Sequence, residues 1–590
     1  MKLIKLTLHK PFLFFYIPFF CLNVSAQIFP VKKYPQGYFI YPVGAPVGLA
    51  ANFGELRSNH YHMGLDCKTQ KKENLPVYAA ADGYVAKVKI EPGGFGRAIY
   101  INHPNGLTTL YGHLNNFFPA LEKYVKEEQY RQESWKIFID IPAQIFQIKK
   151  SDFIAFSGNT GGSQGPHLHF EIRDTETDKV LNPLLFGFEV KDKVPPSILR
   201  LAIYDRCIST YSQVPKLLSL KFVNGIYVPA PSLIIINSDR VSFGISAFDK
   251  STGSSNNNGI YEAEIFDNND AVAGFQLDSI SYDETRYENA HIDYKLKLGG
   301  GSYVEHLSRL PGYPAGVYKD ARSDGVINID DDKIHSIKIV VKDTYGNTSV
   351  LQFHVQRGSA KTHQSLKDSS YFQQREFHPG FVNVFEKDDV QLILGEHDLY
   401  DSIRFLYAKK AASSPQAISE LHMVHNGLVP VHGYLTLKLK STFAIPDSLK
   451  DKIIMQRSWG GKTEVLKPKR EARPDDPAGR GDWFTAQFRN FGNFQLLIDN
   501  LPPTISAIGI KDNANLTGAS QIIFVFKDNN DQIKNFRAEL DGKWLRFTND
   551  KGRSFIYKFD EMCTPGSHEL KVSVEDEAGN TATKVFHFTR

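Results

Sequence analysis

Residues 153–172 read "FIAFSGNTGGSQGPHLHFEI", two apolar segments separated by a glycine-rich loop. Each apolar segment is short and bounded by turn residues, which predicts a strand on either side of the loop. Alternate residues of a strand face the same side, so His167 and His169 project together, about 6 to 7 Å apart. This spacing suits one metal ligand with a second polar group beside it.

A second histidine-rich stretch, "HYHMGLD" at residues 60–66, precedes the first by about a hundred residues. His62 and Asp66 can each supply a metal ligand from a nearby turn. With His169 they form a set of two imidazoles and one carboxylate. Such a set is typical of catalytic zinc, which has three protein ligands and an open position for water. We therefore predict a zinc site in which the metal activates water and polarises a carbonyl oxygen.

Proton transfer at such a site requires further groups, and two histidines remain as candidates. His113 ends the segment "TTLYGH" at residues 108–113, and His167 lies beside the ligand His169. An isolated H-x-H pair in a strand is most often an ordinary structural feature. The order of the motifs, with a third histidine and turn glycines between them, favours a metal site.

The ordered set "HYHMGLD", "LYGHL" and "SGNTGGSQGPHLHFEI" resembles the lysostaphin/LytM-type zinc metallopeptidases, over roughly residues 45–185. The resemblance implies a peptidase domain at 27–190 that cleaves peptide bonds in peptidoglycan. It further implies a role for each candidate: zinc ligands His62, Asp66 and His169, and catalytic residues His113 and His167. Which of the two catalytic histidines performs which step stays open. His60 is extra to the pattern, and we expect it to be non-catalytic.

The function implied by this resemblance is an exported zinc metalloendopeptidase that hydrolyses peptide crosslinks of peptidoglycan through a zinc-activated water. One alternative is a non-catalytic LytM-type activator of another cell-wall hydrolase. The other is an envelope adhesion or scaffold protein in which the β domains matter most. Because no ligand of the family pattern is missing, the sequence favours the enzyme.

A charged segment interrupts the β pattern of the predicted peptidase domain. Residues 115–135, "NNFFPALEKYVKEEQYRQESW", have Pro119 near their start and predict a helix. The segment lengthens the connection between His113 and His167 beyond that common in the family. It is expected to wall the substrate groove, to gate it, or to dock on a neighbouring domain.

The rest of the chain contains an internal repeat. Residues 335–355 and 568–588 are identical at nine of 21 positions, and both have a D-x-x-G-N-T turn between alternating strands. The Pro-Pro starts of the two copies also match. The copies resemble bacterial immunoglobulin-like modules and predict β-sandwiches at 194–356 and 501–590. We expect the first copy to carry an insertion around "STGSSNNNG", residues 251–259, and in the segment after it. After the first copy we expect a linker at 357–375 and then a β-rich domain of uncertain type at 376–500.

The fold class is thus mostly β, with a helical insertion in an N-terminal antiparallel peptidase domain and immunoglobulin-like sandwiches after it. The composition is that of a globular protein, with 42% hydrophobic and 23% charged residues. The formal net charge of +4 includes three lysines among the first ten residues, so the remainder is close to neutral. This balance excludes a nucleic-acid partner.

Those lysines precede the apolar stretch "PFLFFYIPFFCL" at residues 11–22. A membrane-spanning helix needs roughly 20 residues, so this stretch predicts a signal peptide, 1–26, cleaved after Ala26. An uncleaved N-terminal anchor is the alternative. The expected protein is exported to the periplasm or cell envelope and has no membrane span after cleavage. Its expected partners are peptidoglycan peptides, and envelope proteins or glycans bound by the β-sandwich domains.

Overall fold

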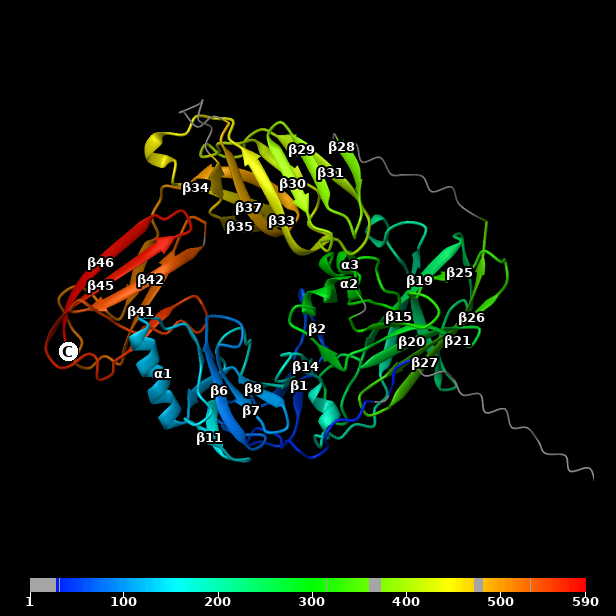
Figure 1. Ribbon diagram of the computed structural model, residues 1–590, viewed down its shortest axis with the longest axis horizontal. Helices are drawn as coiled ribbons and strands as arrows, with labels where there is room; N and C mark the ends of the chain where they lie inside the picture. Colours follow the sequence, from blue (N-terminus) through cyan, green and yellow to red (C-terminus); the bar gives the residue numbers. More distant parts are fainter. Residues whose placement is uncertain (1–27, 31, 315, 360–372, 472–480, 531) are drawn as a thin grey trace, which may run out of the picture.

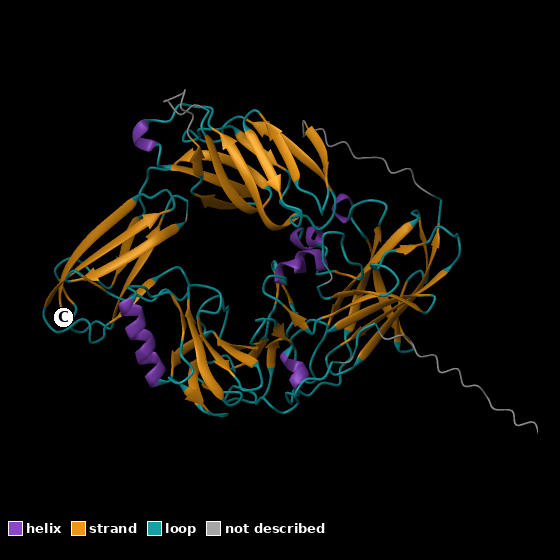
Figure 2. Ribbon diagram, in the orientation of Figure 1, coloured by secondary structure: helices purple, strands orange, loops and turns teal. Residues whose placement is uncertain are grey.

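The computed structural model describes residues 28–30, 32–314, 316–359, 373–471, 481–530 and 532–590. The predicted signal peptide and residues 360–372 of the predicted linker lie outside the described residues. Strands dominate the described parts of the chain, as predicted (Figure 2). Among the described residues, no helix is long and apolar enough to cross a membrane.

The N-terminal domain is built on an antiparallel sheet whose strands follow the order β1-β4-β13-β8-β7-β6-β10. In that order their bounds are Leu49–Ala51, Leu65–Lys68, His167–Asp174, Leu107–Gly112, Arg97–Asn102, Gly83–Ile90 and Ile137–Asp140. A second sheet contains β5 (Pro76–Tyr78), β12 (Phe153–Ser157) and β9 (Leu114–Phe117). Alternating apolar residues of both sheets meet in one core. Within the first sheet β4 pairs with β13, so the segment that contains Asp66 lies beside the segment that contains His167 and His169.

The predicted helix is present as α1, Pro119–Arg131, with Pro119 in its first turn. Its buried residues are Leu121, Val125 and Gln129, spaced four apart on one face. Leu121 and Val125 belong to the same hydrophobic core as the sheet. The insertion is therefore an integral part of the domain and completes its core.

The first immunoglobulin-like copy follows as one 12-stranded sheet in which most strands pair antiparallel. Its main strands are β15 (Ser197–Asp205), β19 (Arg240–Phe248), β20 (Glu262–Asp267), β21 (Asp270–Gln276), β26 (His335–Lys342) and β27 (Thr348–Arg357), with β18 (Leu233–Ile236) parallel to β27. The core of this copy includes Phe53, Tyr61 and Met63 from the N-terminal domain. The two domains therefore share a core.

The extra residues of the first copy lie in two segments, and only one of these follows residues 251–259 as predicted. Residues 251–259 form a short connection between β19 and β20, and two other segments hold the additions. One comprises β16 (Lys216–Val223), β17 (Ile226–Pro229) and β18. The other runs from residue 278 to 334 and contains α2 (Glu288–His291) and α3 (Tyr294–Leu298). The addition at 278–334 lies in the predicted segment. The addition of β16 to β18 was missed, because a stretch rich in serine and asparagine indicates a loop but carries no information on strands added elsewhere.

The third region pairs two antiparallel sheets, β28-β31-β32-β38-β34-β35 and β29-β30-β33-β37-β36. In chain order, β28 to β38 span Gln373–Phe377, Asn383–Lys387, Val390–Leu394, Ile403–Lys410, Leu421–Val424, Pro430–Lys440, Ile453–Trp459, Lys462–Leu466, Lys469–Glu471, Trp483–Asn490 and Gly492–Ile498. Their inward-facing residues form a separate hydrophobic core. This region is a β-sandwich between the two repeats.

The last domain contains the second copy of the repeat. Its main strands are β39 (Thr504–Ile508), β40 (Ala514–Asn515), β41 (Gln521–Lys527), β42 (Ile533–Leu540), β44 (Phe555–Lys558), β45 (Ser567–Asp576) and β46 (Thr581–Thr589). β45 and β46 form a hairpin like that of β26 and β27. In both hairpins the first aspartate of the turn accepts hydrogen bonds from the asparagine four residues later. The repeated motif therefore folds in the same way twice.

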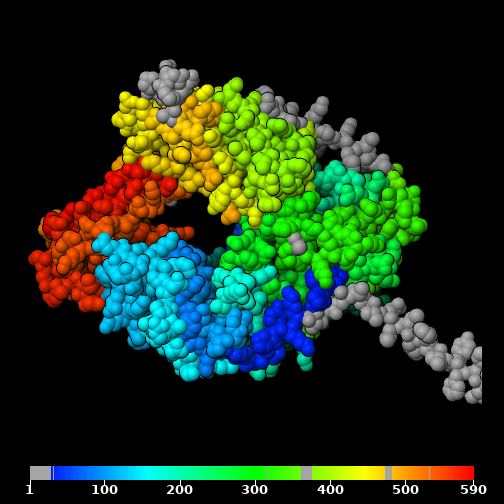
Figure 3. All heavy atoms as spheres, in the orientation of Figure 1, coloured from blue at the N-terminus to red at the C-terminus, as the bar shows by residue number. Residues whose placement is uncertain are grey.

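The four domains form a closed ring (Figure 1), and a central opening is visible in the space-filling view (Figure 3). β14 (Val180–Leu181) pairs with β22 (Ser279–Ile280) and continues the first sheet into the second domain. The Arg286 side chain donates to the Val431 carbonyl in the third domain, and Lys452 donates to the Gly579 carbonyl in the last. The last domain then packs on α1 of the first.

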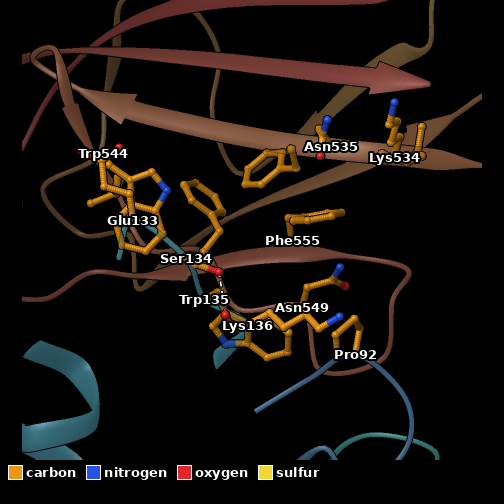
Figure 4. Close-up of a pocket in the computed structure, with 14 residues that line it drawn as sticks. Pro92, Glu133, Ser134, Trp135, Lys136, Lys534, Asn535, Trp544, Asn549 and Phe555 are labelled. Atoms are coloured by element: carbon orange, nitrogen blue, oxygen red, sulfur yellow. Dashed lines mark hydrogen bonds between the residues drawn. The ribbon is translucent and has the colours of Figure 1, made fainter. Parts of the chain in front are cut away.

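The contact that closes the ring is both charged and aromatic. Lys126 on α1 pairs with Asp560 at 2.7 Å and with Glu561 at 2.7 Å. The Tyr130 ring meets Trp544 edge to face, with centroids 5.2 Å apart. A pocket of about 390 Å³ lies beside this contact, between residues 133–136 of the first domain and strands of the last (Figure 4).

Candidate metal centre

Three donor atoms converge at one edge of the first sheet. Asp66 in β4 lies directly opposite His169 in β13, and His62 follows β3 (His60–Tyr61). His62 Nε2 lies 2.9 Å from Asp66 Oδ1, and His169 Nδ1 lies 3.1 Å from each of these atoms. Zinc bonds of about 2.0–2.2 Å place tetrahedral donors roughly 3.3 Å apart. One cation therefore fits between these three residues.

The remaining ring nitrogens of the two histidines fix which atoms face the centre. His62 Nδ1 lies 2.7 Å from the Asn52 carbonyl oxygen, to which it donates a proton. His169 Nε2 lies 2.9 Å from Glu171 Oε1 and donates to that carboxylate. In neutral imidazoles the opposite nitrogens then carry lone pairs toward Asp66. Two lone pairs facing a carboxylate fit a cation between them, so the residues match a zinc ligand set.

The two predicted catalytic histidines lie beside this set. The His113 and His167 rings have centroids 4.7 Å apart, and His167 Nε2 lies 3.3 Å from Asp66 Oδ1. His113 Nδ1 donates to the Thr160 carbonyl, and His167 Nδ1 to the Gly165 carbonyl. All five predicted side chains therefore meet in one place, while their individual roles stay predictions. His60 is exposed and bonds to the Ser58 carbonyl.

Burial sets the charge state of these groups. Burial, together with the nearby His169 and His167, lowers the pKa of His113 to about 3, so His113 is neutral at physiological pH. Burial opposes ionisation of Asp66, yet protonated His62, through its charge, and protonated His167 and His169, through hydrogen bonds, hold the pKa of this carboxylate well below its usual range; a cation held by the neutral histidines would supply the same positive charge. The site thus combines an ionised carboxylate with a neutral imidazole.

A buried hydrogen-bond network contacts the ring nitrogen of His169 that faces away from Asp66. This network was not predicted from the sequence. Glu171 is fully buried and accepts hydrogen bonds from His169, from Arg173 and, at 2.5 Å, from the Tyr282 hydroxyl. Although burial raises the pKa of Glu171, the charge of Arg173 and these hydrogen bonds lower it to about 2. The ionised Glu171 holds the His169 ring in the orientation that a metal ligand needs.

The first immunoglobulin-like copy also positions His62. The residues on either side of it, Tyr61 and Met63, are buried in the core of that copy. The Tyr61 amide donates to the Thr285 hydroxyl, and the Tyr61 ring lies 5.6 Å from the His291 ring. Contacts with the next domain therefore support two of the three candidate ligands indirectly, His62 through its chain neighbours and His169 through Glu171.

The glycine-rich loop that precedes β13 positions both catalytic candidates, and the last domain holds this loop. The Gly161 amide donates to the Asp550 carbonyl. Lys551 Nζ donates to the Ser163 carbonyl at 2.6 Å and to the Gly161 carbonyl at 3.2 Å. The loop supplies the carbonyls of Thr160 and Gly165 that orient His113 and His167. Closure of the ring is thus linked to the geometry of the site.

The described residues form a β-rich, multidomain protein with a buried His-Asp-His group that could hold a metal ion. Three family models match the chain: Peptidase family M23 at residues 60–130, a Zu5-like domain at 375–499 and a Bacterial Ig-like domain at 504–589. The chain therefore contains a peptidase family M23 domain and ends in an Ig-like domain. The M23 match includes His62, Asp66 and His113 and ends within α1.

Curated relatives match about a quarter of the chain. The DD-carboxypeptidase/endopeptidase Mpg of Neisseria meningitidis is 29% identical over 151 residues, which are 26% of this chain and 26% of Mpg. An uncharacterized metalloprotease of Haemophilus influenzae is 31% identical over 155 residues, 25% of this chain and 27% of the relative. The cell division protein DipM of Caulobacter vibrioides is 26% identical over 161 residues, 27% and 20% of the two chains. The matched region spans about a quarter of these relatives or less.

Among solved structures, a mutant catalytic domain of the M23 protein EnpA from Enterococcus faecalis matches 26% of this chain and 99% of its own. Its sequence identity is 22% and its TM-score 0.19. The catalytic domain of lysostaphin from Staphylococcus simulans matches 23% of this chain and 87% of its own, with 21% identity and a TM-score of 0.16.

Proposed function

We propose that this chain is an exported zinc metalloendopeptidase that hydrolyses peptide crosslinks of peptidoglycan. The observation that carries the proposal is the meeting of His62, Asp66 and His169 in a set whose tautomers leave three donor atoms facing one point. Cell-wall activity is proposed because the similar protein Mpg of Neisseria meningitidis is a DD-carboxypeptidase/endopeptidase.

The roles proposed for the residues follow from their hydrogen bonds. His62, Asp66 and His169 hold the ion, and a bound zinc ion supplies Lewis acidity and lowers the pKa of water. His113 is neutral and donates its Nδ1 proton to Thr160, so its Nε2 carries a lone pair. We assign to His113 the acceptance of a proton from the attacking water. His167 lies beside the ligands and hydrogen-bonds the reacting peptide.

Digestion of crosslinked muropeptides tests the proposal. The full chain loaded with zinc is expected to shorten them, and a chelator is expected to stop the reaction. His169→Ala should bind zinc poorly and lose at least a hundredfold in rate, since it removes a ligand. His60→Ala is the matched control, because His60 is exposed and lies outside the ligand set.

Two results would contradict the proposal. A zinc-loaded chain that leaves every peptide bond intact, but accelerates a separate wall hydrolase, would identify a non-catalytic activator. Activity that survives both chelation and His169→Ala would place the chemistry at another site.

A further inference from the structure

Each immunoglobulin-like copy gathers three aspartates away from the metallopeptidase centre. In each set the carboxylate oxygens lie within 4.8 Å of one another. The sets are Asp192, Asp249 and Asp343 in the first copy, and Asp499, Asp528 and Asp576 in the second. They are called here the first and second triads.

The two triads occupy equivalent positions in the repeat. Asp192 and Asp499 both stand three residues before the first proline of a Pro-Pro pair. Asp249 directly follows β19 and Asp528 directly follows β41, and each of these strands pairs with the first strand of its copy. The third members, Asp343 and Asp576, begin the two D-x-x-G-N turns. A chance cluster of surface acids would not recur at three matching positions.

An oxygen atom in each triad is buried without a hydrogen-bond partner. Asp249 is 5% exposed, and its Oδ1 is unpartnered although the carboxylate faces the other two. The equivalent Asp528 also has a buried, unpartnered Oδ1. Within the described residues, no lysine or arginine forms an ion pair with either triad. Since a buried acceptor without a partner is costly, each triad is set to receive a ligand of positive charge.

The electrostatics of both triads favour the same ligand. Burial and the charges of Asp192 and Asp343 raise the pKa of Asp249 to about 7. Burial and the charges of Asp499 and Asp576 raise the pKa of Asp528. Carboxylates repel one another in this way when no cation lies between them.

We propose that each immunoglobulin-like copy binds one calcium ion through its aspartate triad. Calcium takes six to eight oxygen ligands, so backbone carbonyls and waters would complete the three carboxylates. Zinc prefers nitrogen and sulfur, and these triads offer neither. The two sites are separate from the His-Asp-His centre and do not depend on the function proposed for it.

Both triads lie where the chain enters a domain, which suggests that the ions stiffen the connections between domains. Asp192 lies in the connection that enters the first copy, between η1 (Pro183–Phe186) and β15. Asp499 lies directly after β38, where the chain enters the last domain. Each ion would tie an incoming connection to two loops of the copy that it enters. Calcium would thereby stiffen two of the joints of the ring.

Calorimetric titration of the full, zinc-loaded chain with calcium tests this proposal. In excess magnesium we expect two calcium ions per chain, bound at concentrations up to about 1 mM, as in extracellular modules. Asp249→Asn and Asp528→Asn should each leave one ion, and the double variant none. Asp270→Asn, at an exposed aspartate in the first copy, should leave two. No calcium binding, or two ions bound by the folded double variant, would overturn the proposal.

Terbium luminescence gives a second test that needs no aspartate variant. Tyr345 lies two residues after Asp343 in the D-x-x-G-N turn, and its amide donates to the Asp343 carboxylate, so this tyrosine is close to the proposed ion. Tyrosine-sensitised terbium emission from the wild-type chain should fall when calcium is added. Tyr345→Phe should weaken that emission while the calorimetric stoichiometry stays at two. Emission that calcium does not displace would count against the sites.

Discussion

The Tyr282 hydroxyl donates a hydrogen bond to Glu171 across the boundary between the peptidase domain and the first immunoglobulin-like copy. Glu171 in turn accepts from the candidate zinc ligand His169. A side chain in one domain therefore reaches the metal centre of another through a single carboxylate. Together with Tyr61 and Met63, which are buried in the core of that copy, this contact makes the metal centre a property of two domains.

Removing this hydroxyl should weaken metal binding. Tyr282→Phe deletes a hydrogen bond to the carboxylate that orients His169, and such supporting contacts typically change metal affinity by about 10- to 100-fold. We expect zinc affinity to fall by about tenfold, at the lower end of this range, because Tyr282 contacts the ligand His169 only through Glu171. Competition with a fluorescent zinc chelator measures the affinity. Tyr434→Phe, at an exposed tyrosine in the third domain, is the control, and equal affinities for the two variants would contradict the prediction.

The glycine-rich loop should tolerate alanine at one position and not at another. Gly161 has φ of +66°, and a Cβ atom there would lie 2.2 Å from the Gly96 amide nitrogen. Gly161→Ala should displace the Thr160 carbonyl that orients His113 and reduce kcat/KM by about a hundredfold, with zinc content unchanged. Gly165→Ala, where a Cβ atom meets open space, should remain within about twofold of wild type. Equal activity of the two variants would show that the loop does not position His113.

Reversing one charge on α1 should open the ring. Lys126→Glu replaces two ion pairs with repulsion from Asp560 and Glu561. We expect an increase in the radius of gyration measured by small-angle X-ray scattering, reduced by high salt because screening weakens the repulsion. Lys123→Glu lies one turn away on the same helix and is mostly exposed, so it should leave the radius unchanged. An unchanged radius for both variants would mean that the remaining contacts, Tyr130 with Trp544 and Lys551 with the glycine-rich loop, suffice for closure.

The third domain should lose stability in mild acid through His425. This histidine is 4% exposed, neither ring nitrogen has a hydrogen-bond partner, and burial lowers its pKa from 6.5 to about 3. Unfolded His425 gains a proton near pH 6.5 while the folded residue stays neutral. Its contribution is therefore complete above pH 6.5 and declines as pH falls toward 3, by about 1.4 kcal/mol per pH unit.

Thermal unfolding at pH 7.5 and pH 5 checks this expectation. His425→Asn should reduce the acid-induced fall in Tm, and asparagine tolerates the positive φ of 56° at this position. His397→Asn, at an exposed histidine of the same domain, should behave like wild type. The same acid sensitivity in all three proteins would show that other groups dominate.

The alternation of residues along a strand predicted much of the candidate site, and the same pattern could have predicted further residues of it. The two-residue period of β13 placed His167 and His169 on one face. Extended by one and two further steps, it also places Glu171 and Arg173 there. Tyr282 was beyond its reach, because 111 residues separate it from Glu171 and no local pattern links them. The same limit applies to the shared core, which brings Tyr61 to the second domain through long-range packing.

Helix α1 shows a similar division. Pro119 and the charged face predicted a helix, and the helix is present. The packing of this helix on the last domain could not be predicted, because it involves a contact between Lys126 and Asp560, which are 434 residues apart in the chain. The addition of β16 to β18 in the first copy was missed for a related reason, since turn composition marks a break in regular structure but not which break receives added strands.

The closed arrangement of the four domains has a consequence for proteolysis. In an open string of modules, one cut in a connection releases a fragment. Here each domain touches both of its neighbours around the circle, so a single nick leaves two pieces still held to each other at two interfaces. Cleavage in one connection would therefore leave the assembly in one piece, and disassembly would need a second break.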